Sequence, residues 1–344
     1  MADKGFDEIL RDLKNKIYSP VYLLQGEEAY YIDQISDYIE KHVLDDMEKE
    51  FNQTVVYGRD TETPVLLSTA KRYPMMANYS VVIVKEAQDL RYWKKESGKI
   101  DPDPMLLYVN NPLSSTILVF CYKYDTLDKR TKFYKSLQKH AVIFESKKIY
   151  DNKVPDWVNS YLQSRGVKIK PQAAQLIADY LGTDLSKVAN ECDKLLLNLK
   201  KGEEVGVEQV ESYIGISKEF NVFELNTALA KRNSEKVFRI ANYFKANSKA
   251  NPFVVTMGQL YSYFTKVLMY HSLPDKSKGA AAAAMGVNPF FISDYEVAAR
   301  NYPVAKVVRV IGLLKEYDLK SKGFENASVS EGDLLRELLY KIMN

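Results

Sequence analysis

Residues 21–28, Val-Tyr-Leu-Leu-Gln-Gly-Glu-Glu, decide the fold, because an apolar run ends there at Gly26 and a helical pattern follows. A strand, a glycine turn and a helix in this order are typical of a phosphate-binding loop, G-x-x-x-x-G-K-[ST]. The three positions that should hold its second glycine, its lysine and its hydroxyl are Tyr31, Ile32 and Asp33. The sequence therefore predicts a degenerate phosphate loop, with no ammonium for phosphates and no hydroxyl for Mg²⁺.

A second deficiency lies after the apolar run Val81–Val84, which ends in Lys85 and Glu86. An active NTPase of this arrangement would carry an acidic pair there to hold Mg²⁺ and orient water. We read Lys85 and Glu86 as a degenerate magnesium site, with the alternative that Glu86 is an ordinary surface residue at a strand end. Both deficiencies favour an assembly component over a motor, and we expect no cofactor and no bound metal.

Composition places the chain among ordinary globular proteins. Its 344 residues are 46% hydrophobic and 27% charged, with a formal net charge of +3. No apolar run reaches the roughly 18 residues that a membrane span needs, and the N-terminal stretch is charged where a signal peptide would be apolar. We therefore expect a cytoplasmic protein without a membrane partner. From residue 216 onward 18 basic residues outnumber 12 acidic ones. This excess favours binding to nucleic acid or to an acidic partner; the alternative is that it belongs to an ordinary solvated helical surface.

The pattern of apolar residues changes near residue 150. Before it, short apolar runs of the kind that form buried parallel strands alternate with helical stretches, which predicts an open α/β sheet. These runs are Val21–Gln25, Thr54–Tyr57, Val81–Val84, Thr116–Tyr122 and Ala141–Phe144. After it the patterns are helical only. We predict an α/β domain over 1–150, a small helical domain over 151–215 and a second helical domain over 216–344.

The stretch Tyr73–Ala77 is the candidate contact surface, because Met75 and Met76 follow Pro74 directly. Pro74 should end the preceding helix. Two soft, unbranched side chains on a turn suit insertion into an apolar pocket of a partner. The alternative left open is that both methionines cap the core of their own domain.

No catalytic constellation is recognisable in the chain. Its three histidines, His42, His140 and His271, are scattered, and the common metal and nucleophile motifs are missing from the sequence. We therefore expect that this chain contributes no catalytic residue. It can still be a subunit of a larger enzyme.

Several segments together resemble the delta subunit family of the bacterial DNA polymerase III clamp loader over essentially the full length. They are Pro20–Glu28, Tyr73–Ala77, Leu127–Lys135, and Gly182–Leu185 followed by Asn190–Glu191 and Lys194–Leu195. No single segment is a strict motif, but their order and spacing are fairly specific.

The resemblance implies an AAA+-like α/β domain with a degenerate nucleotide site, a small helical lid and a helical collar. It implies a subunit of a polymerase holoenzyme that binds the sliding clamp and opens it for loading on primed DNA without hydrolysing ATP. The implied partners are the clamp, the loader ATPase (gamma/tau) and delta-prime. The implied clamp contacts are Pro74, Met75 and Met76, although the family usually carries a leucine–phenylalanine-like pair where this chain has two methionines.

Two alternatives stay open beside this reading. One is a remodelled AAA+ NTPase, which would bind ATP with Mg²⁺. The other is a DNA-binding regulatory module that would use the basic C-terminal third and the helix–turn–helix pattern of Met285–Asn301.

Overall fold

The computed structural model describes residues 4–93, 103–200, 202–214, 220–324 and 328–344. The chain divides into two compact units, one over residues 1–149 and the other over 150–344. The fold class predicted from the sequence, an α/β part followed by an all-helical part, is confirmed. The limits of the strands agree with the predicted apolar runs to within two residues, the largest difference being at the end of the fifth strand, at Ser146 instead of Phe144.

The first unit contains a five-stranded sheet with the strand order β2-β3-β4-β1-β5, in which all neighbouring strands are parallel. The strands are β1 (Val21–Gly26), β2 (Gln53–Tyr57), β3 (Ser80–Lys85), β4 (Thr116–Lys123) and β5 (Val142–Ser146). The helices are α1 (Phe6–Lys14), α2 (Ala29–His42), α3 (Asp46–Asn52), α4 (Thr63–Ala70), α5 (Pro104–Asn110) and α6 (Lys132–His140). Because all strands run the same way, their carboxyl ends meet at one edge of the sheet.

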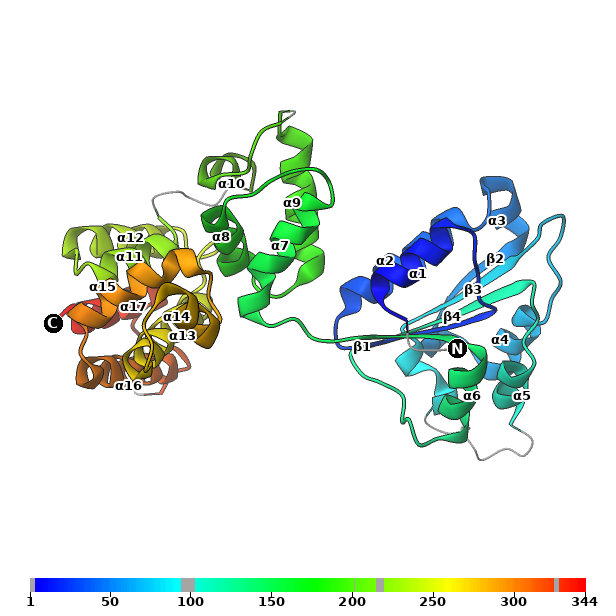
Figure 1. Ribbon diagram of the computed structural model, residues 1–344. Helices are drawn as coiled ribbons and strands as arrows, with labels where there is room; N and C mark the ends of the chain where they lie inside the picture. The colour runs from blue at the N-terminus through cyan, green and yellow to red at the C-terminus, as the bar shows by residue number, and fades with distance from the viewer. Residues whose placement is uncertain (1–3, 94–102, 201, 215–219, 325–327) are drawn as a thin grey trace. The chain divides into compact units, whose positions relative to one another are not determined.

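Helices cover both faces of this sheet, which explains why its inner strands are apolar along their whole length. Val21 and Leu23 of β1 belong to the core under α4, α5 and α6. Tyr22 and Leu24 belong to the opposite core, under α1 and α2. Figure 1 shows the two layers of helices on either side of the strands. β2 lies at one edge of the sheet and is only partly buried.

The second unit is helical in all its described elements (Figure 1). Its first helices are α7 (Val154–Gln163), α8 (Pro171–Leu181), α9 (Leu185–Asn198) and α10 (Val207–Ile214). The remaining helices are α11 (Val222–Ala230), α12 (Ser234–Ala246), α13 (Phe253–Ser272), α14 (Lys278–Met285), α15 (Ile292–Asn301), α16 (Val304–Ser321) and α17 (Glu331–Met343). α11 to α17 share one apolar core.

The division of this second unit into residues 151–215 and 216–344 stays a prediction, because the boundary falls on residues outside the described ranges. In the described part of the chain, no helix combines the length and the apolar character that crossing a membrane requires.

Candidate functional site

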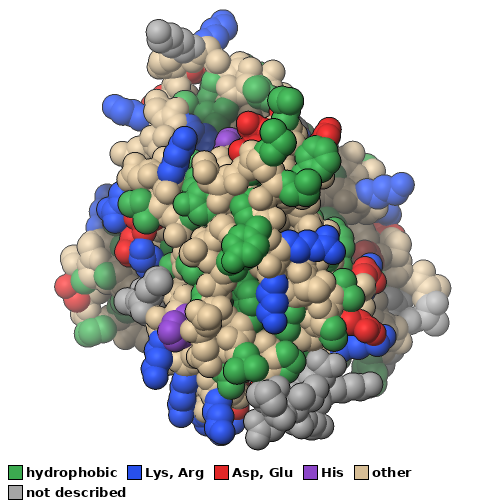
Figure 2. Space-filling model, turned by 90° about the vertical axis from the view of Figure 1, so that its right-hand side faces the viewer, with side chains coloured by type: hydrophobic (Ala, Val, Ile, Leu, Met, Phe, Trp, Pro, Cys, Tyr) green, Lys and Arg blue, Asp and Glu red, His purple; other side chains and the backbone are tan. Residues whose placement is uncertain are grey.

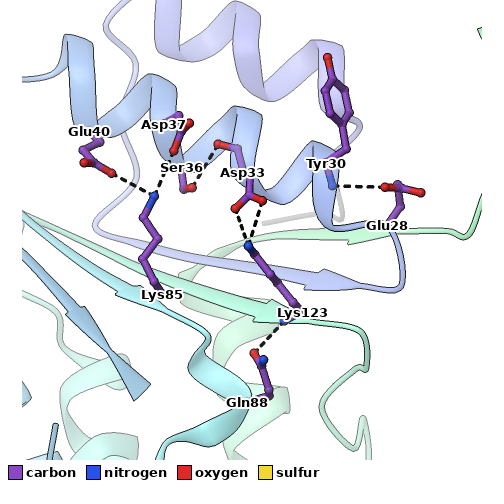
Figure 3. Close-up of polar contacts among 9 residues, drawn as sticks. All are labelled: Glu28, Tyr30, Asp33, Ser36, Asp37, Glu40, Lys85, Gln88 and Lys123. Atoms are coloured by element: carbon purple, nitrogen blue, oxygen red, sulfur yellow. Dashed lines mark hydrogen bonds and ion pairs between the residues drawn. The ribbon is translucent and has the colours of Figure 1, made fainter. Parts of the chain in front are cut away.

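Two regions of the α/β unit carry the residues singled out from the sequence. The first is the carboxyl edge of the sheet, where β1, β3 and β4 end beneath α2 (Figure 3). The second is the loop of residues 71–79, which joins α4 to β3.

The turn between β1 and α2 is short, and its backbone N–H groups already have acceptors. Only Glu27 and Glu28 separate Gly26 from α2. The Glu27 N–H donates to the carbonyl oxygen of Ser146 at 3.3 Å, and the Glu28 N–H donates to the Ser146 hydroxyl at 3.1 Å. The Glu28 carboxylate caps α2 by accepting from the Tyr30 N–H at 3.3 Å. A phosphate needs such N–H groups to point at the ligand, and here β5 and the capping carboxylate accept from them.

Gly26 is required by this close approach of two strands. Its φ is 124°, and a Cβ added to it would lie 2.1 Å from the carbonyl oxygen of Ser146. Of the residues that replace the phosphate-loop groups, Ile32 is fully buried, and the Tyr31 ring packs edge-on against Phe6 at 4.9 Å. Both side chains therefore serve the core between α1, α2 and the sheet.

Asp33, the third of those residues, forms an ion pair with a lysine that the sequence analysis missed. Lys123 is the last residue of β4, and its ammonium lies 2.7 Å from the Asp33 carboxylate. The two side chains are only 15% and 35% exposed, so water screens the pair weakly. The Lys123 N–H also donates to the Gln88 side chain at 3.0 Å. One signal could have found Lys123: it directly follows the apolar run Thr116–Tyr122, as Lys85 follows Val81–Val84.

Lys85 occupies the end of β3, where an acidic magnesium site would lie. Its ammonium is 3.0 Å from the Asp37 carboxylate and 3.0 Å from that of Glu40, both on α2. Burial by itself would lower the pKa of Lys85, but its hydrogen bonds to Asp37 and Glu40 outweigh burial and raise that pKa. The neighbouring Glu86 adopts a left-handed conformation with a φ of 50°. The edge therefore presents a cation that is already paired with two anions.

We call Asp33, Asp37, Glu40, Lys85 and Lys123 the carboxyl-edge cluster; Figure 3 shows both lysines pointing at the carboxylates of α2. Across the described ranges, no group of three or more histidine, cysteine or acidic side chains is arranged to hold a metal ion. The cluster can hold α2 against β3 and β4, but its lysines are engaged by acids of the same domain.

The 71–79 loop has the opposite character, because its apolar side chains face solvent. Met75 is 64% exposed and Met76 is fully exposed, so the alternative that they cap their own core is wrong. Met76 also adopts a left-handed conformation, with a φ of 54°. The expectation that Pro74 ends the preceding helix is only loosely met, because α4 already ends at Ala70. Pro74 restricts only itself and Tyr73, so it keeps the helix from resuming but does not set its end at Ala70.

Other exposed apolar side chains lie on the elements around β2. They are Met47 and Phe51 on α3, Val55 and Tyr57 on β2, Val65 on α4 and Tyr73 in the loop. Figure 2 views the molecule from the side on which Figure 1 draws α3, β2 and α4, and it shows hydrophobic side chains gathered over the middle of that face. Exposed apolar side chains gathered on one face are typical of sites of protein contact.

Comparison with known proteins gives three results. Residues 22–147 match the family model described as DNA polymerase III, delta subunit. The chain is 25% identical to DNA polymerase III subunit delta of Bacillus subtilis (strain 168) over 320 residues, which cover 92% of this chain and 91% of that protein. The solved structure of the Bacillus subtilis DNA clamp loader delta protein (YqeN) matches with a TM-score of 0.58 and 22% identity, over 98% of this chain and 99% of the other. The resemblance to the delta subunit family that was read from the sequence is confirmed, and the solved structure supports the fold.

Proposed function

We propose that this chain, which carries the pattern of the DNA polymerase III delta subunit family over residues 22–147, is the delta subunit of a bacterial clamp loader. In this proposal it binds the ring-shaped sliding clamp and helps to open it for loading onto primed DNA. It does so without hydrolysing ATP, so the energy of nucleotide hydrolysis comes from other subunits.

The observation that carries the proposal is the exposure of Met75 and Met76 on the 71–79 loop. Two large apolar side chains in water are unfavourable for an isolated chain. A partner with an apolar pocket removes this cost by burying them. Burying a methionine fully stabilises a complex by about 1.5–3 kcal/mol. Two such residues can therefore account for a large part of a micromolar binding free energy, about 8 kcal/mol.

Ring opening follows from differential binding. A ligand shifts a conformational equilibrium only by the difference between its affinities for the two states. The chain would therefore bind the open clamp interface more tightly than the closed one. The methionines alone provide too little energy to break a large interface, so we expect an interface that is already strained.

The carboxyl-edge cluster supports the absence of ATP hydrolysis. The Lys85 and Lys123 ammonium groups are paired with carboxylates of α2, and the turn N–H groups of Glu27 and Glu28 donate to Ser146. A nucleotide would have to displace these contacts before it could bind.

In this proposal the helical unit joins the chain to the other subunits of the clamp loader. We propose that residues 151–215 act as the lid and residues 216–344 as the collar that joins the loader ATPase (gamma/tau) and delta-prime. Contacts with primed DNA are then made through the assembled complex.

The test is the binding of the purified chain to the sliding clamp of the same organism, measured by titration calorimetry. We expect a dissociation constant in the micromolar range or below for the wild type, and a loss of about 30- to 300-fold for the Met75→Ala/Met76→Ala double variant. Met269→Ala, which shortens an exposed methionine of α13 in the other unit, is the matched control and should bind like the wild type. Wild-type affinity in the double variant would refute the proposal.

A further inference from the structure

The 71–79 loop is held by one buried side chain from another element. Asn52 is the last residue of α3 and is 5% exposed. Its Oδ1 accepts from the Met75 N–H at 2.6 Å, and its Nδ2 donates to the Met75 carbonyl oxygen at 3.0 Å. The same Nδ2 donates to the Glu48 carbonyl oxygen of α3 at 3.0 Å. One amide therefore engages both backbone groups of Met75 and ties them to the end of a helix.

Apart from Asn52, side-chain packing of Ala77 and Tyr79 on the core holds this loop, and backbone hydrogen bonds do not. Residues 73–79, all of them described, make no backbone–backbone hydrogen bond. The nearest such bonds on either side are donated by the N–H groups of Lys71, Arg72 and Ser80. The next residue after Met75 is the fully exposed Met76, whose φ of 54° is a conformation that non-glycine residues adopt only at a cost. Such a conformation persists when its surroundings determine it strongly.

We propose that Asn52 is a positioning residue for partner binding, one that holds Met75 and Met76 in the conformation in which they dock. This inference rests on the proposed function, because it takes the apolar pocket of the sliding clamp as the partner. Asn52 does not contact the partner; it acts through the Met75 backbone. The loop is ordered before the encounter, so binding does not have to order it.

The consequence for binding follows from population arithmetic. If only a fraction of the molecules hold the loop in the docking conformation, the apparent dissociation constant rises in inverse proportion to that fraction. Asn52→Ala removes two hydrogen bonds to Met75, and a competent fraction of about one in ten gives about a tenfold weaker complex. We expect this loss mainly in the association rate, because the bound loop is held by the clamp itself. Met76→Ala, by contrast, should mainly raise the dissociation rate.

The first experiment needs no partner. We expect hydrogen exchange at the Met75 amide of the isolated chain to be about tenfold faster in Asn52→Ala than in the wild type, with unchanged exchange at Val82 in β3. Asn110→Ala is the matched control, since Asn110 also ends a helix of this unit and accepts one side-chain hydrogen bond, from Ser136. It should leave Met75 exchange unchanged. Equal exchange at Met75 in Asn52→Ala and the wild type would overturn the inference.

The second experiment measures clamp association and dissociation rates by surface-based kinetics. Asn52→Ala should associate about tenfold more slowly, with a dissociation rate within twofold of the wild type, whereas Asn110→Ala should change neither rate. Asn52→Asp keeps the acceptor for the Met75 N–H but turns a carboxylate oxygen towards the carbonyl oxygens of Met75 and Glu48, so association at least as slow as that of Asn52→Ala is expected. Exchange at Val82 shows whether each variant is folded.

A double-mutant cycle separates positioning from general destabilisation. In a Met75→Ala/Met76→Ala background neither docking side chain remains, so the effect of Asn52→Ala on the association rate should shrink to about twofold or less. A tenfold effect of Asn52→Ala in that background would overturn the inference. If the wild type binds the clamp and Asn52→Ala binds with the same rates, only this inference fails; if the wild type does not bind, the proposed function fails as well.

Discussion

The carboxyl-edge cluster and the 71–79 loop belong to the same α/β unit but differ in how their side chains are satisfied. At the carboxyl edge, Lys85 and Lys123 are paired with acids of α2 at 2.7–3.0 Å. In the loop, Met75 and Met76 are exposed, and only the backbone of the loop is held. This difference determines where an outside partner can add stability. A ligand gains little binding free energy from a region whose polar groups are already paired internally. It gains more from exposed apolar side chains on an ordered backbone, because their burial is favourable.

The largest expected effect tests the close approach of β5 to the turn after β1. Gly26→Ala would place a Cβ 2.1 Å from the Ser146 carbonyl oxygen, at a φ of 124° that L-residues rarely adopt. We expect a loss of about 3 kcal/mol or more in the free energy of unfolding of the α/β unit. The measurement is urea unfolding followed by Trp93 fluorescence in a Trp157→Phe background, which reports this unit alone.

Gly5→Ala is the control for that experiment, because no atom lies within 4 Å of the added Cβ. It should change the unfolding free energy by less than about 0.5 kcal/mol. A Gly26→Ala variant as stable as this control would mean that the turn after β1 has room for added atoms and is not closed by β5.

A smaller effect distinguishes the two methionines of the loop. Met76 is fully exposed and Met75 only 64% exposed, so Met76 has more surface to bury in a partner. We expect Met76→Ala to weaken clamp binding by about 10- to 30-fold and Met75→Ala by about 3- to 10-fold. Melting temperatures should stay within about 1–2 °C of the wild type, because exposed side chains contribute little to stability. The reverse order of the two affinities would show that a pocket around Met75 dominates.

A smaller effect still is expected from breaking the carboxyl-edge cluster. Lys85→Met leaves Asp37 and Glu40 close together without their cation, which should lower the unfolding free energy by about 1–2 kcal/mol, a figure that allows for the partial exposure of both acids. Because the pKa of Lys85 is raised in the folded state, its contribution is complete below the ordinary lysine pKa and is lost only as the pH rises through the raised value. The difference between the Lys85→Met variant and the wild type should therefore persist from pH 7 to pH 9.

Lys41→Met serves as the comparison for this variant. Lys41 also approaches Asp37, but at 3.9 Å and with a side chain that is 69% exposed. An exposed pair of this kind contributes about 0–0.5 kcal/mol. Equal effects of Lys41→Met and Lys85→Met would contradict the importance of the Lys85 contacts.

The sequence predicted the sheet well because the chemistry of a buried parallel strand is local. The run Val21–Gln25 is apolar along its length, and β1 covers it with one further residue, Gly26. The missing phosphate-loop groups at Tyr31, Ile32 and Asp33 could also be read directly, because a motif is defined by spacing. Such features depend on neighbours in the chain, and no knowledge of tertiary contacts is needed to see them.

The sequence did not predict the contacts that join distant segments. Lys123 meets Asp33 across 90 residues of chain, and Asn52 meets Met75 across 23, so no local pattern announces either pair. The exposure of Met75 and Met76 was also open, because two apolar residues on a turn suit a core as well as a partner. Only the packed structure decides between these outcomes.

The most direct test of the central claim, that this unit acts through its loop and not through its carboxyl edge, is one calorimetric comparison. The chain is titrated with the sliding clamp in the presence and in the absence of 1 mM ATP with Mg²⁺, and the nucleotide is also titrated into the chain alone. The account predicts no heat of nucleotide binding and the same clamp dissociation constant, within twofold, in both titrations. Nucleotide binding in the micromolar range, or a tenfold change in clamp affinity when ATP is present, would contradict it.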